Sequence, residues 1–69
     1  MAPKEPFPNK VRQEREARLL CKSELAKKAG ISPATLDRLE RGLSSRPSTR
    51  RNVLFALGYT ILQKEVVFP

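Results

Sequence analysis

The sequence predicts an all-α fold, a single small domain of four or five short helices, and two observations support this. With 69 residues, the chain is long enough for one domain only. Stretches of good helix formers are separated by Gly30, Gly42 and Gly58, and serines suited to capping a helix, Ser32 and Ser48, precede two of these stretches. Because so small a domain buries little surface, a bound partner or a second subunit is expected to add to its stability.

The beginning of the chain divides into an arm and a first helix. Residues 1–8 contain three prolines and are expected to form a flexible arm. A domain over residues 9–58 then begins with Asn9 as the N-cap of a helix that runs through Arg18, since no glycine or proline interrupts this stretch. Its apolar face is thin and consists of Val11 and Ala17.

A second helix is predicted from Lys22 to Ala29. Leu25, Ala26 and Ala29 recur at a spacing that places them on one face of a helix. Gly30 follows directly, and a glycine at this position adopts the left-handed conformation that satisfies the last carbonyl groups. We therefore expect this helix to end at Gly30.

The third helix has the clearest local signal in the chain. Ser32 can cap the free N–H groups of the first turn, and Pro33 has no N–H to lose at the first helical position. The helix buries Leu36 and Leu39 and stops near Arg41, before a glycine. Only a short connection separates it from the second helix, so the two are expected to cross steeply as a helix-turn-helix.

The last part of the domain is predicted to be a polar loop over residues 43–47 and a fourth helix from Thr49 to Leu57, capped by Ser48 and ended by Gly58. Val53, Leu54 and Leu57 form its inward face. Arg50 and Arg51 lie in the first turn, where the helix dipole disfavours cations. We expect these two arginines to serve binding rather than helix stability.

Residues 59–69 form a tail for which two structures are considered. Tyr59 to Gln63 and Val66 to Phe68 are rich in strand-forming residues, which favours a short C-terminal strand paired with a second subunit. The alternative is a fifth helix capped by Thr60. We prefer the strand.

Composition restricts the classes of function. A net charge of +7 favours a polyanionic partner, although a small domain can also be charged for solubility. The single cysteine allows no internal disulfide and suggests a reducing, cytoplasmic setting, and no apolar run suggests a membrane span. With no histidine, no cluster of metal ligands and no nucleophile beside a base, we expect neither an enzyme nor a metal or cofactor site.

The run from Val11 to Gly58 resembles the Xre, or Cro/C1-type, family of bacterial and phage repressors, which implies a lambda-repressor-like domain. The resemblance lies in the capping, glycine and apolar positions of the second and third helices, which match in register: Glu24-Leu25-Ala26, Gly30-Ile31-Ser32, Leu36, Leu39, Glu40 and Gly42. It further implies a buried ion pair between Arg15 and Glu40, unless both are solvated surface charges.

Three positions depart from the family pattern. Cys21 replaces the usual serine, threonine or asparagine cap of the second helix, and a thiol caps poorly. Leu19 replaces a frequent glycine, and Glu14 stands where an apolar residue is common. These departures concern the first helix and its connection to the second.

The resemblance implies that the N-terminal part of the third helix enters the major groove of DNA. Arg38 is the best candidate to read a base, since arginine donates two hydrogen bonds to guanine, but it can also bind phosphate or pair with Asp37. Asp37 can accept from the cytosine amino group or orient an arginine. Ala34 can contact a thymine methyl, and Pro33 lies beside it.

The remaining expected contacts are with the DNA backbone and with another protein. Hydroxyl and cationic side chains around the helix starts are expected at phosphates, with Arg46 a candidate for the minor groove: Lys22, Ser32, Thr35, Arg41, Ser45, Arg46, Arg50 and Arg51. The tail is similar to that of high-persistence-type antitoxins, which implies a homodimer through Phe55, Tyr59, Ile61 and Leu62. The sequence therefore predicts a dimeric operator-binding repressor or, alternatively, an antitoxin or bridging factor that also binds a protein such as a toxin.

Overall fold

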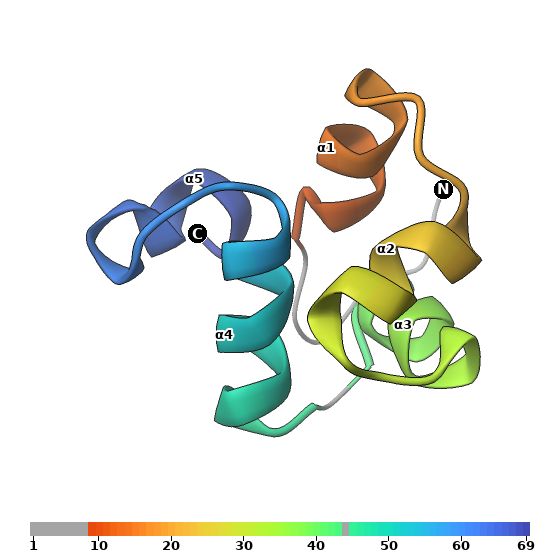
Figure 1. Cartoon of the computed structure of the whole chain (residues 1–69). Helices are drawn as coiled ribbons and strands as arrows, with labels where there is room; N and C mark the ends of the chain where they lie inside the picture. The colour runs from red at the N-terminus through yellow and green to blue at the C-terminus, as the bar shows by residue number, and fades with distance from the viewer. Residues whose placement is uncertain (1–8, 44) are drawn as a thin grey trace, which may run out of the picture.

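The computed structural model describes residues 9–43 and 45–69, so the predicted N-terminal arm lies outside the described residues. The elements in chain order are α1 (Val11–Ala17), α2 (Lys22–Ala29), α3 (Pro33–Glu40), α4 (Pro47–Ala56), the 3-10 helix η1 (Ile61–Gln63) and α5 (Lys64–Val67) (Figure 1). These two ranges hold helices and no strand, which confirms the predicted all-α fold.

The core is built from all five α-helices. α2 packs against both α3 and α4, and Figure 1 shows α4 between the α2–α3 pair and α5. The buried apolar side chains are Val11, Leu25, Ala26, Ala29, Leu36, Leu39, Val53, Leu54, Leu57 and Val67. Every leucine that the sequence assigned to the inner faces of α2, α3 and α4 is therefore in the core.

The two central helices begin and end as predicted. Gly30 adopts φ 70°, and the amide of Ile31 donates to the Ala26 carbonyl at 2.9 Å, which closes the last turn of α2. The Ser32 hydroxyl accepts from the amide of Thr35 at 3.1 Å and caps α3. The turn is thus fixed by contacts within a few residues of sequence.

The predicted start of α1 is wrong in detail. Lys10, and not Asn9, is the N-cap residue. The Asn9 side chain accepts from the amide of Val11 at 3.1 Å and donates to the Leu39 carbonyl at 2.8 Å, so it connects α1 to the end of α3. Ala17, expected on the inner face, is exposed.

The predicted start of α4 is also wrong. The helix begins at Pro47 with Arg46 as N-cap, so Ser48 lies inside the first turn and does not cap it. Proline is suited to the first helical position because its φ is already helical and it has no N–H to leave unpaired. This signal, two residues upstream of the predicted start, decides the boundary.

The predicted C-terminal strand is wrong, and the alternative fifth helix is present. Thr60 and Gln63 form a capping box, in which the Gln63 side chain accepts from the amide of Thr60 at 3.0 Å. Val67 is fully buried in the chain's own core, and its carbonyl accepts from the amide of Lys10 at 2.9 Å. Val67 of the tail therefore packs into the core of its own chain, with Tyr59 and Phe68 against it.

Candidate nucleic-acid interface

The candidate interface is the outer face of α3. Leu36 and Leu39 hold the inner face in the core, whereas Pro33, Ala34 and Arg38 are exposed. Ala34 and Arg38, which are four residues apart, lie on the side of the helix opposite the two buried leucines, and Pro33 is exposed in the first turn. The base-contacting residues predicted from sequence, with the half-exposed Asp37, thus lie on one accessible surface.

An ion pair fixes α3 from behind. Arg15 of α1 donates from Nε to Glu40 Oε2 at 2.8 Å and from Nη2 to Oε1 at 3.2 Å, and its remaining Nη1 donates to the Leu20 carbonyl at 2.8 Å. The two side chains are only 9% and 3% exposed, so the pair expected from the resemblance is a buried one. The hydrogen bond to the carboxylate raises the pKa of Arg15. α3 is therefore held rigidly while its outer face stays free.

A second charged cluster lies on the accessible side of the same helices. Lys22, at the start of α2, reaches Asp37 with Nζ 2.5 Å from Oδ1, and Arg41 approaches the other carboxylate oxygen at 3.8 Å. The hydrogen bond from Lys22, and then the charges of both cations, lower the pKa of Asp37. The structure thus joins three residues for which sequence analysis predicted separate roles in DNA binding.

The start of α2 compensates for the unusual cap. Cys21 is exposed and is the N-cap residue, and its Sγ lies 3.1 Å from the Ser23 hydroxyl. The Glu24 carboxylate accepts from the amide of Cys21 at 2.9 Å, an interaction that lowers the pKa of Glu24. A carboxylate in the first turn therefore stabilises this helix start.

A hollow of about 420 Å³ separates the start of α3 from the start of α4. It is lined by Ile31, Ser32, Thr35, Arg38, Ser45, Arg46 and Thr49. The Ser45 hydroxyl is buried here and has no hydrogen-bond partner among the described residues. Arg46, several hydroxyls and the positive end of α4 make this hollow suitable for a phosphate group.

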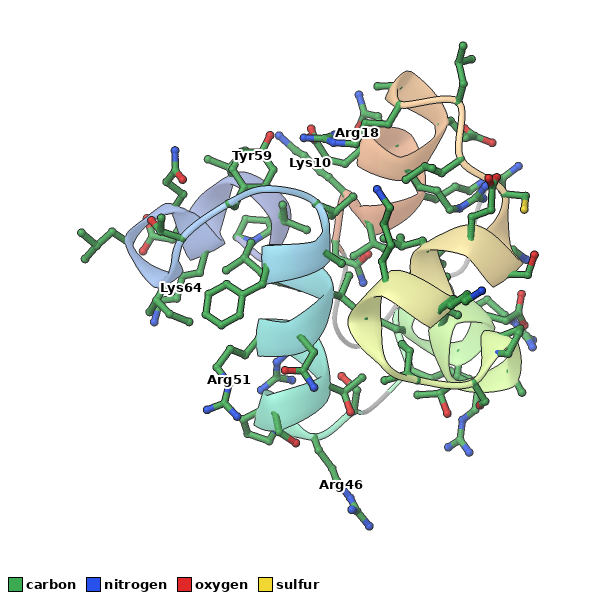
Figure 2. All side chains as sticks on the ribbon, viewed as in Figure 1. Lys10, Arg18, Arg46, Arg51, Tyr59 and Lys64 are labelled. Carbon is green, nitrogen blue, oxygen red and sulfur yellow. The ribbon has the colours of Figure 1, made fainter. Side chains whose placement is uncertain are left out.

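The other expected backbone contacts lie around α4. Arg50 is half-buried and donates to the Ser45 carbonyl at 3.3 Å, so it supports the loop before α4. Figure 2 shows Arg46 and Arg51 projecting from α4, with Arg51 directed away from α3. Arg51 is not among the residues that line the hollow.

Sequence reasoning missed two residues that position the interface. Asn9 holds the end of α3 through the Leu39 carbonyl. Tyr59, expected at a dimer interface, is half-buried, donates from its hydroxyl to Glu14 at 2.6 Å and has its ring centroid 5.5 Å from the Arg18 guanidinium carbon. Both contacts join segments far apart in the chain, for which the sequence carries no local signal.

The described residues contain no group of three or more histidine, cysteine, aspartate or glutamate side chains placed to hold a metal ion. Within the same ranges, no helix has the length and apolar character needed to span a membrane.

Comparison with known protein families gives a match that runs from α1 into α4. The family model described as helix-turn-helix matches residues 11–52, more than half of the chain. No curated protein and no solved structure matches.

Proposed function

The chain belongs to the helix-turn-helix family, whose members are DNA-binding transcription regulators, and from this premise we propose that it is a repressor that binds a specific double-stranded operator. The observation that carries the proposal is the exposed face of α3, capped by Ser32 and supported from behind by the buried ion pair of Arg15 and Glu40. No enzymatic role is part of the proposal, and we place its action at DNA in the cytoplasm.

We assign base contacts to Arg38, Ala34, Asp37 and Pro33. Arg38 is exposed, and no ion pair is found for it among the described residues, so its guanidinium can donate to guanine O6 and N7. Ala34 lies one turn earlier on the same exposed face and suits a thymine methyl group.

We assign backbone contacts to the hollow between α3 and α4. A phosphate placed there meets Arg46, the hydroxyls of Ser32 and Thr35 and the start of α4. If about five cations of the interface neutralise phosphates, log affinity falls with log salt concentration at a slope near −4.5 per subunit.

The direct test of base reading is selection of bound sequences from random duplex DNA. It is carried out with the unchanged protein, with Arg38→Ala and with Arg12→Ala, which removes an exposed arginine from α1. Arg38→Ala is expected to abolish a guanine preference at one position of each half-site and to weaken operator binding by about 1–3 kcal/mol, whereas Arg12→Ala keeps the preference. Uniform weakening on every sequence would instead assign Arg38 to a phosphate.

Ser45 offers a test of the phosphate hollow. Because its buried hydroxyl has no partner among the described residues, Ser45→Ala is expected to leave stability nearly unchanged and to weaken binding to all duplexes equally, by about 1 kcal/mol. The exposed Ser48 provides the control Ser48→Ala. Equal affinities for the two variants would contradict a phosphate at this hollow.

We further propose that the regulator acts as a homodimer on a palindromic operator. Phe55, Ile61 and Leu62 are 50%, 46% and 96% exposed on the neighbouring elements α4 and η1, and a two-fold dimer would cover them together with the edge of Tyr59. Sedimentation of the protein with Leu62→Glu, against the exposed control Gln63→Glu, tests this assignment. A dimer that persists in the Leu62 variant would place the interface elsewhere.

The same exposed apolar side chains support a second function, that of an antitoxin or bridging factor that binds another protein as well as DNA. A protein that sediments as a monomer at micromolar concentration, with a toxin encoded beside it that forms a complex sensitive to Leu62→Glu, would favour this alternative over the homodimer.

A further inference from the structure

Asp37 is an acidic residue on a surface built to meet a polyanion. It lies on the accessible side of α3, where its carboxylate is shared between Lys22, at 2.5 Å, and Arg41, at 3.8 Å. The Lys22 and Asp37 side chains are 44% and 38% exposed. The carboxylate thus engages two cations that could otherwise contact DNA phosphates.

The geometry places these contacts in competition. Lys22 and Arg41 must turn away from Asp37 to pair with phosphates, and the carboxylate then faces the duplex without its partners. A duplex carries one negative charge per about 1.7 Å of its axis, so an unpaired carboxylate beside it is repelled. Since both pairs are solvent-accessible, the cations can be released when another donor takes their place.

We propose that Asp37 determines specificity by rejecting wrong sequences. On most duplexes Lys22 and Arg41 either stay with Asp37 and make no phosphate contact, or leave it as an unpaired carboxylate beside the backbone. In both cases non-specific binding is weak. On the operator, a base amino group in the major groove, the cytosine N4 or adenine N6 donor, replaces the cations at the carboxylate and releases them to phosphates. This inference rests on the proposed function, and it differs from a base contact alone because it assigns a repulsive element to the interface.

The test compares the operator obtained by selection with a duplex of scrambled sequence, using fluorescence anisotropy over a range of salt concentrations. Asp37→Asn keeps the shape of the side chain and removes its charge, and Asp37→Ala also removes its acceptor. The control is Glu16→Gln, which changes the net charge equally at an exposed position of α1. Thermal unfolding of each variant verifies that it is folded.

Asp37→Asn is expected to tighten binding to the scrambled duplex about tenfold and to leave operator affinity equal or lower, so the specificity ratio falls at least tenfold. Its log–log salt slope on the scrambled duplex becomes steeper by about 1–2, as Lys22 and Arg41 each gain a phosphate. Asp37→Ala, which also loses the acceptor, lowers the ratio at least as far, whereas Glu16→Gln leaves the ratio unchanged.

An unchanged ratio in both Asp37 variants, or weaker binding to the scrambled duplex, would overturn this inference and leave the proposed function standing. Absence of duplex binding by the unchanged protein at low salt would overturn both.

Discussion

Two regions of the molecule are held together in different ways: the helix-turn-helix of α2 and α3, and the contact between α1 and the tail of residues 59–69. In α2 and α3, the turn is closed by groups that are neighbours in sequence, such as Ser32 with the amide of Thr35. At the ends, α1 and the tail are joined by contacts between distant residues, such as the amide of Lys10 with the Val67 carbonyl and Tyr59 with Glu14. The turn between α2 and α3 is therefore determined locally, whereas the support of α1 depends on contacts between distant residues.

The largest effect is expected where the two regions meet, at the ion pair of Arg15 with Glu40. Glu40→Ala leaves the Arg15 guanidinium buried without its carboxylate and should lower the free energy of unfolding by about 3–5 kcal/mol. Urea denaturation followed by circular dichroism measures this. The exposed pair of Arg12 with Glu16 is the control, and Glu16→Ala should cost less than about 0.5 kcal/mol. Similar losses for both variants would mean that burial does not set the strength of the α1–α3 connection.

The next effect tests whether the tail belongs to the core. Val67→Ala removes two buried methyl groups and should lower the free energy of unfolding by about 2 kcal/mol. Val66→Ala is the matched control, because Val66, next in sequence, is 44% exposed. Its change in the free energy of unfolding should lie within about 0.5 kcal/mol of zero. Equal effects at both positions would mean that the tail does not pack into the core in solution.

The tail also shows where prediction from sequence reaches its limit. Val66, Val67 and Phe68 have strand propensity, but propensity is weak when tertiary packing opposes it. Burial of Val67 and the capping box of Thr60 with Gln63 favour the helix. Local signals predicted α2 and α3 because the Ser32 cap, the glycines and the spacing of the apolar residues agree, and no such agreement exists in the tail.

In the candidate site, too, some features follow from local sequence signals and others depend on tertiary packing. The outward face of α3 could be predicted because the positions of Leu36 and Leu39 determine the opposite side of the helix. The contact of Lys22 with Asp37 could not be predicted from the sequence, because it depends on how α2 and α3 cross. Burial of the Ser45 hydroxyl depends on the path of the loop before α4, which the composition of the loop does not determine.

A smaller effect on stability, dependent on pH, is expected at the hydrogen bond between Tyr59 and Glu14, which joins the tail to α1. Hydrogen bonds from Tyr59 and then Arg18 hold the pKa of Glu14 below its ordinary value of 4.5. A depressed pKa stabilises the fold above about pH 4.5, and this contribution is lost as the pH falls through the pKa of the folded state. Tyr59→Phe keeps the ring beside Arg18 and removes the hydrogen bond, so it should cost about 1 kcal/mol at neutral pH.

The difference in stability between the unchanged protein and Tyr59→Phe should then narrow as the solution is acidified, which urea denaturation at a series of pH values measures. Glu24 and Asp37 also have lowered pKa values, but both proteins share them, so they cancel in the difference. A difference that stays constant from neutral pH to about pH 3 would exclude Glu14 as its source.

The smallest effect is a gain in stability at the turn between α1 and α2. α2, α3 and α4 are each followed by a glycine with positive φ, whereas Leu19, at φ 56°, has this role after α1. Its amide donates to the Glu16 carbonyl at 3.0 Å, and the amide of Leu20 donates to the Arg15 carbonyl at 3.2 Å, as the equivalent amides do after α2. The leucine side chain is 92% exposed, so it gains almost no packing in return for this strained conformation.

Leu19→Gly should therefore raise the free energy of unfolding by about 0.5–1 kcal/mol, because the relief of about 1–2 kcal/mol of left-handed strain exceeds the extra entropy that glycine loses on folding. Leu19→Ala keeps the Cβ atom and the strain, and it should leave stability nearly unchanged, which separates backbone relief from the loss of an exposed apolar side chain. Thermal unfolding at matched concentrations measures both variants. A loss of stability in Leu19→Gly would mean that the leucine side chain contributes a contact in solution, and the α1–α2 turn would then depend on more than its own backbone.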